Sequence, residues 1–150
     1  MGAVTFPEPK VVSFIVEHVV PLRFPYDHKP LAERFQVKWT PCLVTLDSEG
    51  REHHRTVGFL SPEELIPSLI LGRAKVHFDH EEFEPALRNL EVVLKDYPKS
   101  GAAPEAMFIR GVCLYKTTHD AKALKEAYER LQGDYPGSEW TKRAYPYRLL

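Results

Sequence analysis

The sequence contains only two cysteines, Cys42 and Cys113, which lie far apart and form no Cys-x-x-Cys motif. So few cysteines exclude a disulfide framework and are typical of a reducing compartment, so we expect a cytoplasmic protein. No stretch approaches the roughly 18 apolar residues of a membrane span. The first residues also lack the charged region and apolar core of a signal peptide.

The sequence also lacks an excess of charge of either sign, with 20 basic and 21 acidic residues and a net charge of -1. We therefore expect neither nucleic acid nor a membrane as a partner. It contains no glycine-rich phosphate loop and no nucleophile elbow, so it predicts no catalytic residue and no cofactor. The length of 150 residues allows one ordinary domain or two small ones.

Proline is abundant, with 13 residues that fall mostly where elements should start or stop. Residues 8–18 predict a short helix with one apolar side. The run Val19–Phe24 is apolar and β-branched and predicts a strand, which Pro21 restricts to the edge of a sheet. A second short helix is expected over Leu31–Phe35.

An antiparallel hairpin is predicted next, with strands over Cys42–Leu46 and roughly Glu52–Gly58, because only a short turn separates the two runs. The following helix should begin at Ser61 with Pro62 at its first position. Glu64 completes the pattern of a capping box.

The dipeptide Thr40-Pro41 before the strand Cys42–Leu46 resembles the corresponding part of the thioredoxin fold, where this proline is cis. The resemblance extends over several further segments: Leu31–Val37, Glu49–Glu52, Thr56–Phe59 and Ser61–Leu65. It implies a cis Thr40–Pro41 bond and an α/β, thioredoxin-like domain over residues 1–70.

The redox cysteine pair of that family is absent, and Met1–Glu8 resembles the segment that follows the pair. The resemblance thus implies a truncated fold without its first strand, which would lie between Val19–Phe24 and Cys42–Leu46. Unpaired strand edges recruit neighbours, so we expect a homodimer with residues 1–25 or the Cys42–Leu46 edge at the contact. The alternative is a thiol–disulfide oxidoreductase whose Cys-x-x-Cys segment is missing from this chain.

Residues 71–150 show helical periodicity and an internal repeat. Leu94–Ser100 matches Gln132–Ser138 with an offset of 38, and a period slightly above 34 indicates repeated helix pairs. The pattern resembles the tetratricopeptide repeat: a small residue in the first helix, a small residue in the second and a closing proline. These positions are Ala74 or Gly111, Ala86 or Ala123, and Pro98 or Pro136. Ser138–Arg143 should form a capping helix.

The candidate partner-binding or substrate-binding residues are Trp39, Thr40, Pro41 and Cys42, because a substrate peptide lies beside this proline in the thioredoxin family. Cys42 could form a mixed disulfide or bind a metal. The favoured interpretation is a buried strand cysteine, because no lysine, arginine or helix start is evidently placed to stabilise a thiolate.

Seven histidines raise the question of a metal site. His53 and His54 are neighbours on a strand and should point to opposite faces, so they cannot easily share a metal. His77 and His80 flank an expected turn between helices, where a solvated role is favoured. The sequence therefore predicts no metal site.

The late aromatic residues are expected to form the repeat core, and some could line a groove for a peptide or a partner helix. The function that the sequence favours is a redox-inactive thioredoxin-like and tetratricopeptide protein that binds a protein partner or peptide.

Overall fold

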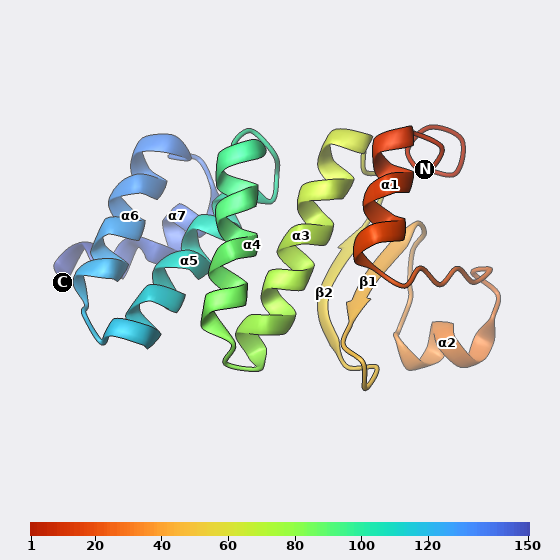
Figure 1. Cartoon of the computed structure of the whole chain (residues 1–150), viewed down its shortest axis with the longest axis horizontal. Helices are drawn as coiled ribbons and strands as arrows, with labels where there is room; N and C mark the ends of the chain where they lie inside the picture. Colours follow the sequence, from red (N-terminus) through yellow and green to blue (C-terminus); the bar gives the residue numbers. More distant parts are fainter.

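The computed structural model describes residues 1–150 and is mostly helical, with one two-stranded sheet near its N-terminal end (Figure 1). The helical repeat region follows the sheet along the chain. In order, the elements are α1 (Pro9–His18), α2 (Lys29–Arg34), β1 (Cys42–Leu46), β2 (Glu52–Val57), α3 (Pro62–Asp79), α4 (Phe83–Asp96), α5 (Ala103–Thr118), α6 (Lys122–Asp134), α7 (Glu139–Ala144) and the 3-10 helix η1 (Tyr145–Leu149).

The predicted hairpin is confirmed, with β1 and β2 antiparallel. Thr45 pairs with His54 and Leu46 pairs with Glu52, so His53 is an extra, unpaired residue. Such a β-bulge bends its strand and redirects the side chain of the extra residue. At the turn, Oδ1 of Asp47 accepts hydrogen bonds from the backbone N–H groups of Glu49 and Arg51, each 2.9 Å long.

The predicted edge strand Val19–Phe24 is wrong, because this segment forms no strand and no ladder. Pro21 removes a donor N–H, and no neighbouring strand is present to pair with the segment. Its side chains face solvent instead: Val20 is 88% exposed and Leu22 is 75% exposed. The chain thus crosses from α1 to α2 as an extended connection.

The predicted start of α3 is correct, with Ser61 before the helix and Pro62 at its first position. The expected capping box is wrong, because the Ser61 side chain makes no cap hydrogen bond. The carboxylate of Glu64 instead accepts the backbone N–H of Gly101 at 2.8 Å. A contact with the next helix pair has therefore replaced the local cap.

Helix α3 joins the sheet to the repeats and runs continuously through residue 70, where the division between two domains was expected. A Cβ atom built on Gly72 would lie 2.5 Å from Oγ1 of Thr45, so β1 packs directly on the α3 backbone at this point. Glycine permits this close approach because it has no Cβ.

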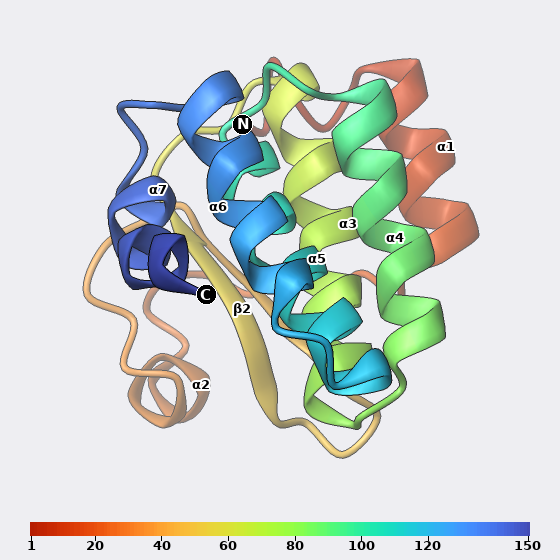
Figure 2. The ribbon, with the colours of Figure 1, turned by 90° about the vertical axis from the view of Figure 1, so that its left-hand side faces the viewer.

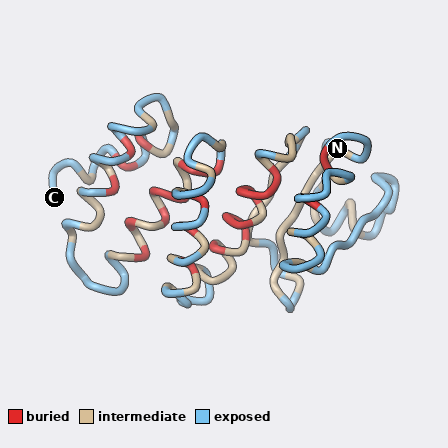
Figure 3. The backbone as a smooth tube through the Cα atoms, turned by 45° about the horizontal axis from the view of Figure 1, so that its top comes forward, coloured by how far each residue is buried: buried red, intermediate tan, exposed pale blue.

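The core follows α3, α4 and α5, and most of the buried chain in Figure 3 lies in the repeat region. Leu65, Leu71 and Leu90 are among its largest fully buried side chains. The N-terminal segment adds Val11 and Thr5, both fully buried, and Oγ1 of Thr5 donates a 2.6 Å hydrogen bond to the Leu60 carbonyl.

The internal repeat is visible in the backbone. The turn after α3 contains Glu81 at φ 59°, and the turn after α5 contains His119 at φ 57°, 38 positions later. Both are left-handed residues without being glycine, which is uncommon. Equivalent positions of the two helix pairs therefore adopt the same rare conformation.

The ends of the two helix pairs match as well. Tyr97 follows α4 with φ -131° and ψ 46°, and Tyr135 follows α6 with φ -136° and ψ 53°. Each tyrosine carbonyl accepts a backbone N–H at 3.0 Å, from Ser100 and Ser138 respectively. The predicted capping helix is also present as α7, where the Ser138 side chain accepts the N–H of Trp140.

Candidate functional site

The first candidate for a partner-binding surface is the side of the helical array, α3 to α6, that lies beside the hairpin. The hairpin and α7 both lie on this side of the array (Figure 2). Lys75 of α3 donates to the carboxylate of Glu105 of α5 at 2.8 Å, and its ammonium nitrogen lies 3.5 Å from Nδ1 of His54. Burial, together with the nearby Lys75 charge, lowers the pKa of His54. This contact connects the sheet to α3 and α5, the first helices of the two helix pairs.

The second candidate surface surrounds the predicted partner-binding residues. A hollow of about 260 Å³ is lined by Tyr26, Val37, Lys38, Trp39 and Thr40. The Trp39 side chain is 72% exposed, and Tyr26 is 78% exposed. The Thr40–Pro41 peptide bond is cis.

The two cysteines are separated in the fold. Arg55 Nη1 lies 3.9 Å from Sγ of Cys42, so the expectation that no cation lies near this thiol is wrong. The same guanidinium also binds the Glu52 carboxylate and donates to the Phe35 carbonyl. Cys113 is buried in α5, burial raises its pKa to about 11, and β1 makes no contact with α5. The thiols therefore do not form a redox pair.

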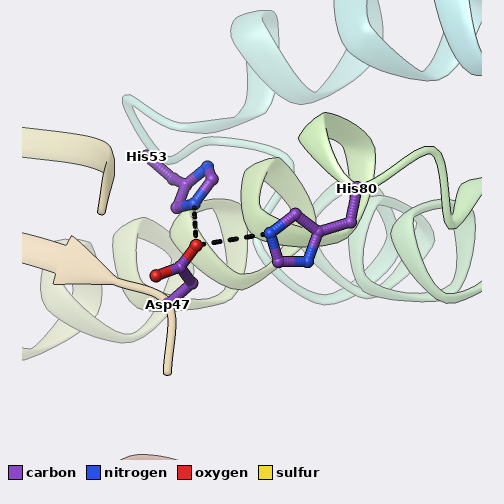
Figure 4. A group of neighbouring side chains, drawn as sticks. All are labelled: Asp47, His53 and His80. Atoms are coloured by element: carbon purple, nitrogen blue, oxygen red, sulfur yellow. Dashed lines mark hydrogen bonds and ion pairs between the residues drawn. The ribbon is translucent and has the colours of Figure 1, made fainter. Parts of the chain in front are cut away.

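The third candidate is a polar cluster where the hairpin turn meets the end of α3 (Figure 4). Asp47 Oδ2 lies 3.1 Å from Nε2 of His53 and 3.3 Å from Nε2 of His80. The Asp47 side chain is 2% exposed and that of His53 is 7% exposed, whereas His80 is 34% exposed. One oxygen and two imidazole nitrogens thus converge at a half-open position.

Two further side chains contact this cluster. Nδ1 of His53 lies 2.5 Å from the carboxylate of Asp79, the last residue of α3. The Arg51 guanidinium lies 2.8 Å from Oδ2 of Asp47 through Nε and 3.2 Å from Nε2 of His80 through Nη2. Each imidazole therefore has a second polar neighbour besides Asp47.

Hydrogen bonding sets the charge of the cluster. The backbone N–H of Arg51, the His53 ring and the Arg51 side chain hold the pKa of Asp47 far below its usual range. Burial opposes protonation of His53, but its hydrogen bonds to Asp79 and Asp47 outweigh burial and raise the pKa of His53. Asp47 is therefore an anion throughout the physiological range.

Sequence reasoning missed this cluster because of the bulge. His53 and His54 were expected on opposite faces, yet both contact α3: His53 reaches Asp79, and Nε2 of His54 lies 3.2 Å from Oγ of Ser68. The extra residue in β2 turns His53 toward the helix. His77, expected with His80 to have a solvated role at the turn, pairs with the exposed carboxylate of Glu82, whereas His80 joins the cluster.

The late aromatic residues mostly pack together, as expected of a repeat core. The Phe108 ring lies 5.2 Å from that of Trp140 and 5.9 Å from that of Tyr147. Tyr145 is 51% exposed and has the Arg148 guanidinium above its ring. These contacts hold α7 and η1 against the last helix pair.

No helix in the structure combines the length and the apolar character that crossing a membrane requires.

The tetratricopeptide repeat family model matches residues 105–138, which include most of α5 and all of α6. No curated protein and no solved structure matches the chain. The match supports the repeat geometry described above and does not extend to the hairpin.

Proposed function

We propose that this chain is a protein-interaction module in which the tetratricopeptide-like array binds a protein partner or peptide. The observation that carries the proposal is the backbone geometry that repeats 38 positions apart, at Glu81 and His119 and at Tyr97 and Tyr135. The second copy of each lies within residues 105–138, the segment that the repeat family matches. Stacked helix pairs of this kind present extended surfaces that suit protein binding. The chain presents no dithiol that would favour an enzyme instead.

The partner surface that we propose includes the loop around Trp39. Exposed aromatic residues beside a hollow are typical of binding surfaces, since aromatic side chains bury large areas with little loss of conformational entropy. Trp39 and Tyr26 provide such residues. In this proposal Thr40, Pro41 and Cys42 form the rim of the contact.

We further propose that the hairpin unit is a redox-inactive relative of the thioredoxin fold over residues 1–70, followed by the repeat domain over residues 71–150. The order of hairpin and following helix supports the thioredoxin-like part, with α3 (Pro62–Asp79) shared by both parts, and both cysteines are free. A reducing compartment such as the cytoplasm agrees with free thiols.

Self-association is also part of the proposal. The connection between α1 and α2 exposes Val20, Leu22 and Tyr26, and each strand of a two-stranded sheet has one unpaired edge. Exposed apolar side chains and unpaired strand edges of this kind favour pairing with a second copy of the chain. Sedimentation at micromolar concentration should show a dimer, and a clean monomer would count against this part alone.

The main experiment is affinity capture with quantitative mass spectrometry, using the wild-type chain, Trp39→Ala and a matched control. Val92→Ala is the control, because Val92 is 41% exposed on α4, away from the Trp39 loop. We expect a partner that is enriched by the wild type and the control and depleted at least tenfold by Trp39→Ala, then reproduced with the purified partner. Equal capture by all three proteins would contradict the proposed surface.

An insulin reduction assay tests the redox part. Thiol–disulfide exchange needs an attacking thiolate and a nearby resolving thiol, and this chain does not pair its thiols. We expect no turnover above background. Turnover that Cys42→Ser abolishes would favour the oxidoreductase instead.

A further inference from the structure

We propose that Asp47, His53 and His80 form a binding site for Zn²⁺. The site joins the hairpin turn to the C-terminal end of α3 and is separate from the proposed partner surface. Figure 4 shows the three side chains pointing toward one another from these two elements. Two imidazoles and one carboxylate are a ligand set that zinc binds in proteins, with water in the fourth position.

The distances fit a tetrahedral ion. Zinc lies about 2.0–2.2 Å from nitrogen and oxygen ligands, so two ligands of a tetrahedron are about 3.4 Å apart. Oδ2 of Asp47 lies 3.1 Å from Nε2 of His53 and 3.3 Å from Nε2 of His80. All three donor atoms lie within 4.8 Å of one another. Only small side-chain movements would place a zinc ion between them.

The surroundings orient the ligands. Asp79 accepts from Nδ1 of His53, so Nε2, which faces Asp47, is the ring nitrogen that would bind the ion in place of its hydrogen bond to Asp47. A carboxylate behind a histidine ligand is a common arrangement at zinc sites, where it fixes the ring and increases its basicity. Two backbone N–H groups likewise hold Oδ1 of Asp47 and leave Oδ2 directed at the histidines.

Arg51 is the competitor for this position. Its guanidinium contacts both Asp47 Oδ2 and His80 Nε2, the atoms that would bind the ion. The Arg51 side chain is 58% exposed, so it can swing into solvent when zinc enters. A purely structural ion-pair network would need Arg51, whereas a zinc site would be improved by its removal. This opposition distinguishes the two interpretations.

The experiment is isothermal titration of the full chain with ZnCl₂ at pH 7.5, together with Co²⁺ absorption spectra as a report on coordination. We expect one ion per chain and cobalt d–d bands of a four-coordinate site. His80→Ala and Asp47→Asn should each weaken zinc affinity at least tenfold, and Asp79→Asn by about 10–100-fold. Arg51→Met should strengthen it.

The matched control is His77→Ala. His77 lies near His80 at the end of α3, but its side chain pairs with Glu82 and lies outside the cluster. This variant should bind zinc like the wild type. Circular dichroism establishes that each variant folds, and if His80→Ala or Asp47→Asn fails to fold, Arg51→Met decides the question. Absence of one-to-one binding, or weaker binding in Arg51→Met, would overturn the proposal and leave an ion-pair network.

Discussion

The hydroxyl of Tyr135 donates a 2.7 Å hydrogen bond to the carbonyl of Pro98, so the end of the second helix pair is tied to the end of the first. Tyr97 holds the equivalent position in the first pair and has the same backbone conformation. No hydrogen bond of the Tyr97 hydroxyl accompanies it. Both tyrosines share the backbone conformation at the end of a helix pair, but only Tyr135 makes the hydrogen bond to the other pair. Comparing them therefore isolates the contribution of that hydrogen bond to stability.

Tyr135→Phe should lower the free energy of unfolding by about 1 kcal/mol, the net contribution of a typical hydrogen bond. Tyr97→Phe is the control and should leave stability nearly unchanged. Urea unfolding followed by circular dichroism measures both. An equal loss in the two variants would mean that the bond to Pro98 does not join the pairs.

Gly111→Ala should destabilise the chain, because the new Cβ would lie 2.4 Å from Cβ of Ala127 on α6. Overpacking of this kind costs about 1–3 kcal/mol, more than the roughly 1 kcal/mol that alanine gains over glycine in a helix. Gly133→Ala is the control, since a Cβ there meets nothing within 4 Å. In thermal unfolding, the Tm should fall in Gly111→Ala and rise in Gly133→Ala. A higher Tm in both variants would contradict the close α5–α6 contact.

Thr5→Val should destabilise the N-terminal segment by about 1–3 kcal/mol, the cost of leaving a buried polar group without its partner. The Thr5 hydroxyl is fully buried and binds the carbonyl of Leu60, and valine keeps its shape but not its donor. Thr5→Ser retains the donor and should lose less. Hydrogen exchange of α1 amides is the measurement, and equal protection in the two variants would refute the role of the hydroxyl.

Much of the fold could be predicted from local signals in the sequence. The short turn after Cys42–Leu46 predicted the hairpin, and the offset between Leu94–Ser100 and Gln132–Ser138 predicted the repeat. The strand Val19–Phe24 could not be judged in the same way. Composition favoured a strand, but a strand also needs a neighbour, and that is decided by the whole chain.

The polar cluster shows why a site is harder to predict than a fold. Asp47 and His53 are close in sequence, but His80 reaches them only because α3 returns along the hairpin. The alternation of a regular strand placed His53 on the wrong face, since no sequence signal marked the bulge opposite Leu46. Only the folded chain brings the three side chains together.

The last prediction concerns the reactivity of the two cysteines. Cys113 is fully buried, and burial raises its pKa from 9.0 to about 11, whereas Cys42 is half-buried on β1. Thiolates react with iodoacetamide and thiols do not. At pH 8 the folded chain should therefore be alkylated at Cys113 only after unfolding, and Cys42, which solvent reaches, provides the accessible thiol for comparison.

The same shift sets a pH dependence of stability. Because the folded state keeps the Cys113 proton more tightly than the unfolded state, this contribution to stability is fully present below about pH 9 and is lost as the pH rises toward about 11. Cys113→Ala lacks this dependence and provides the comparison. The stability advantage of the wild type over this variant should shrink across that window, measured by urea unfolding at pH 8, 9 and 10. A difference that stays constant, or rapid alkylation of Cys113 in the folded chain, would show that the thiol is not enclosed between α5 and its neighbours.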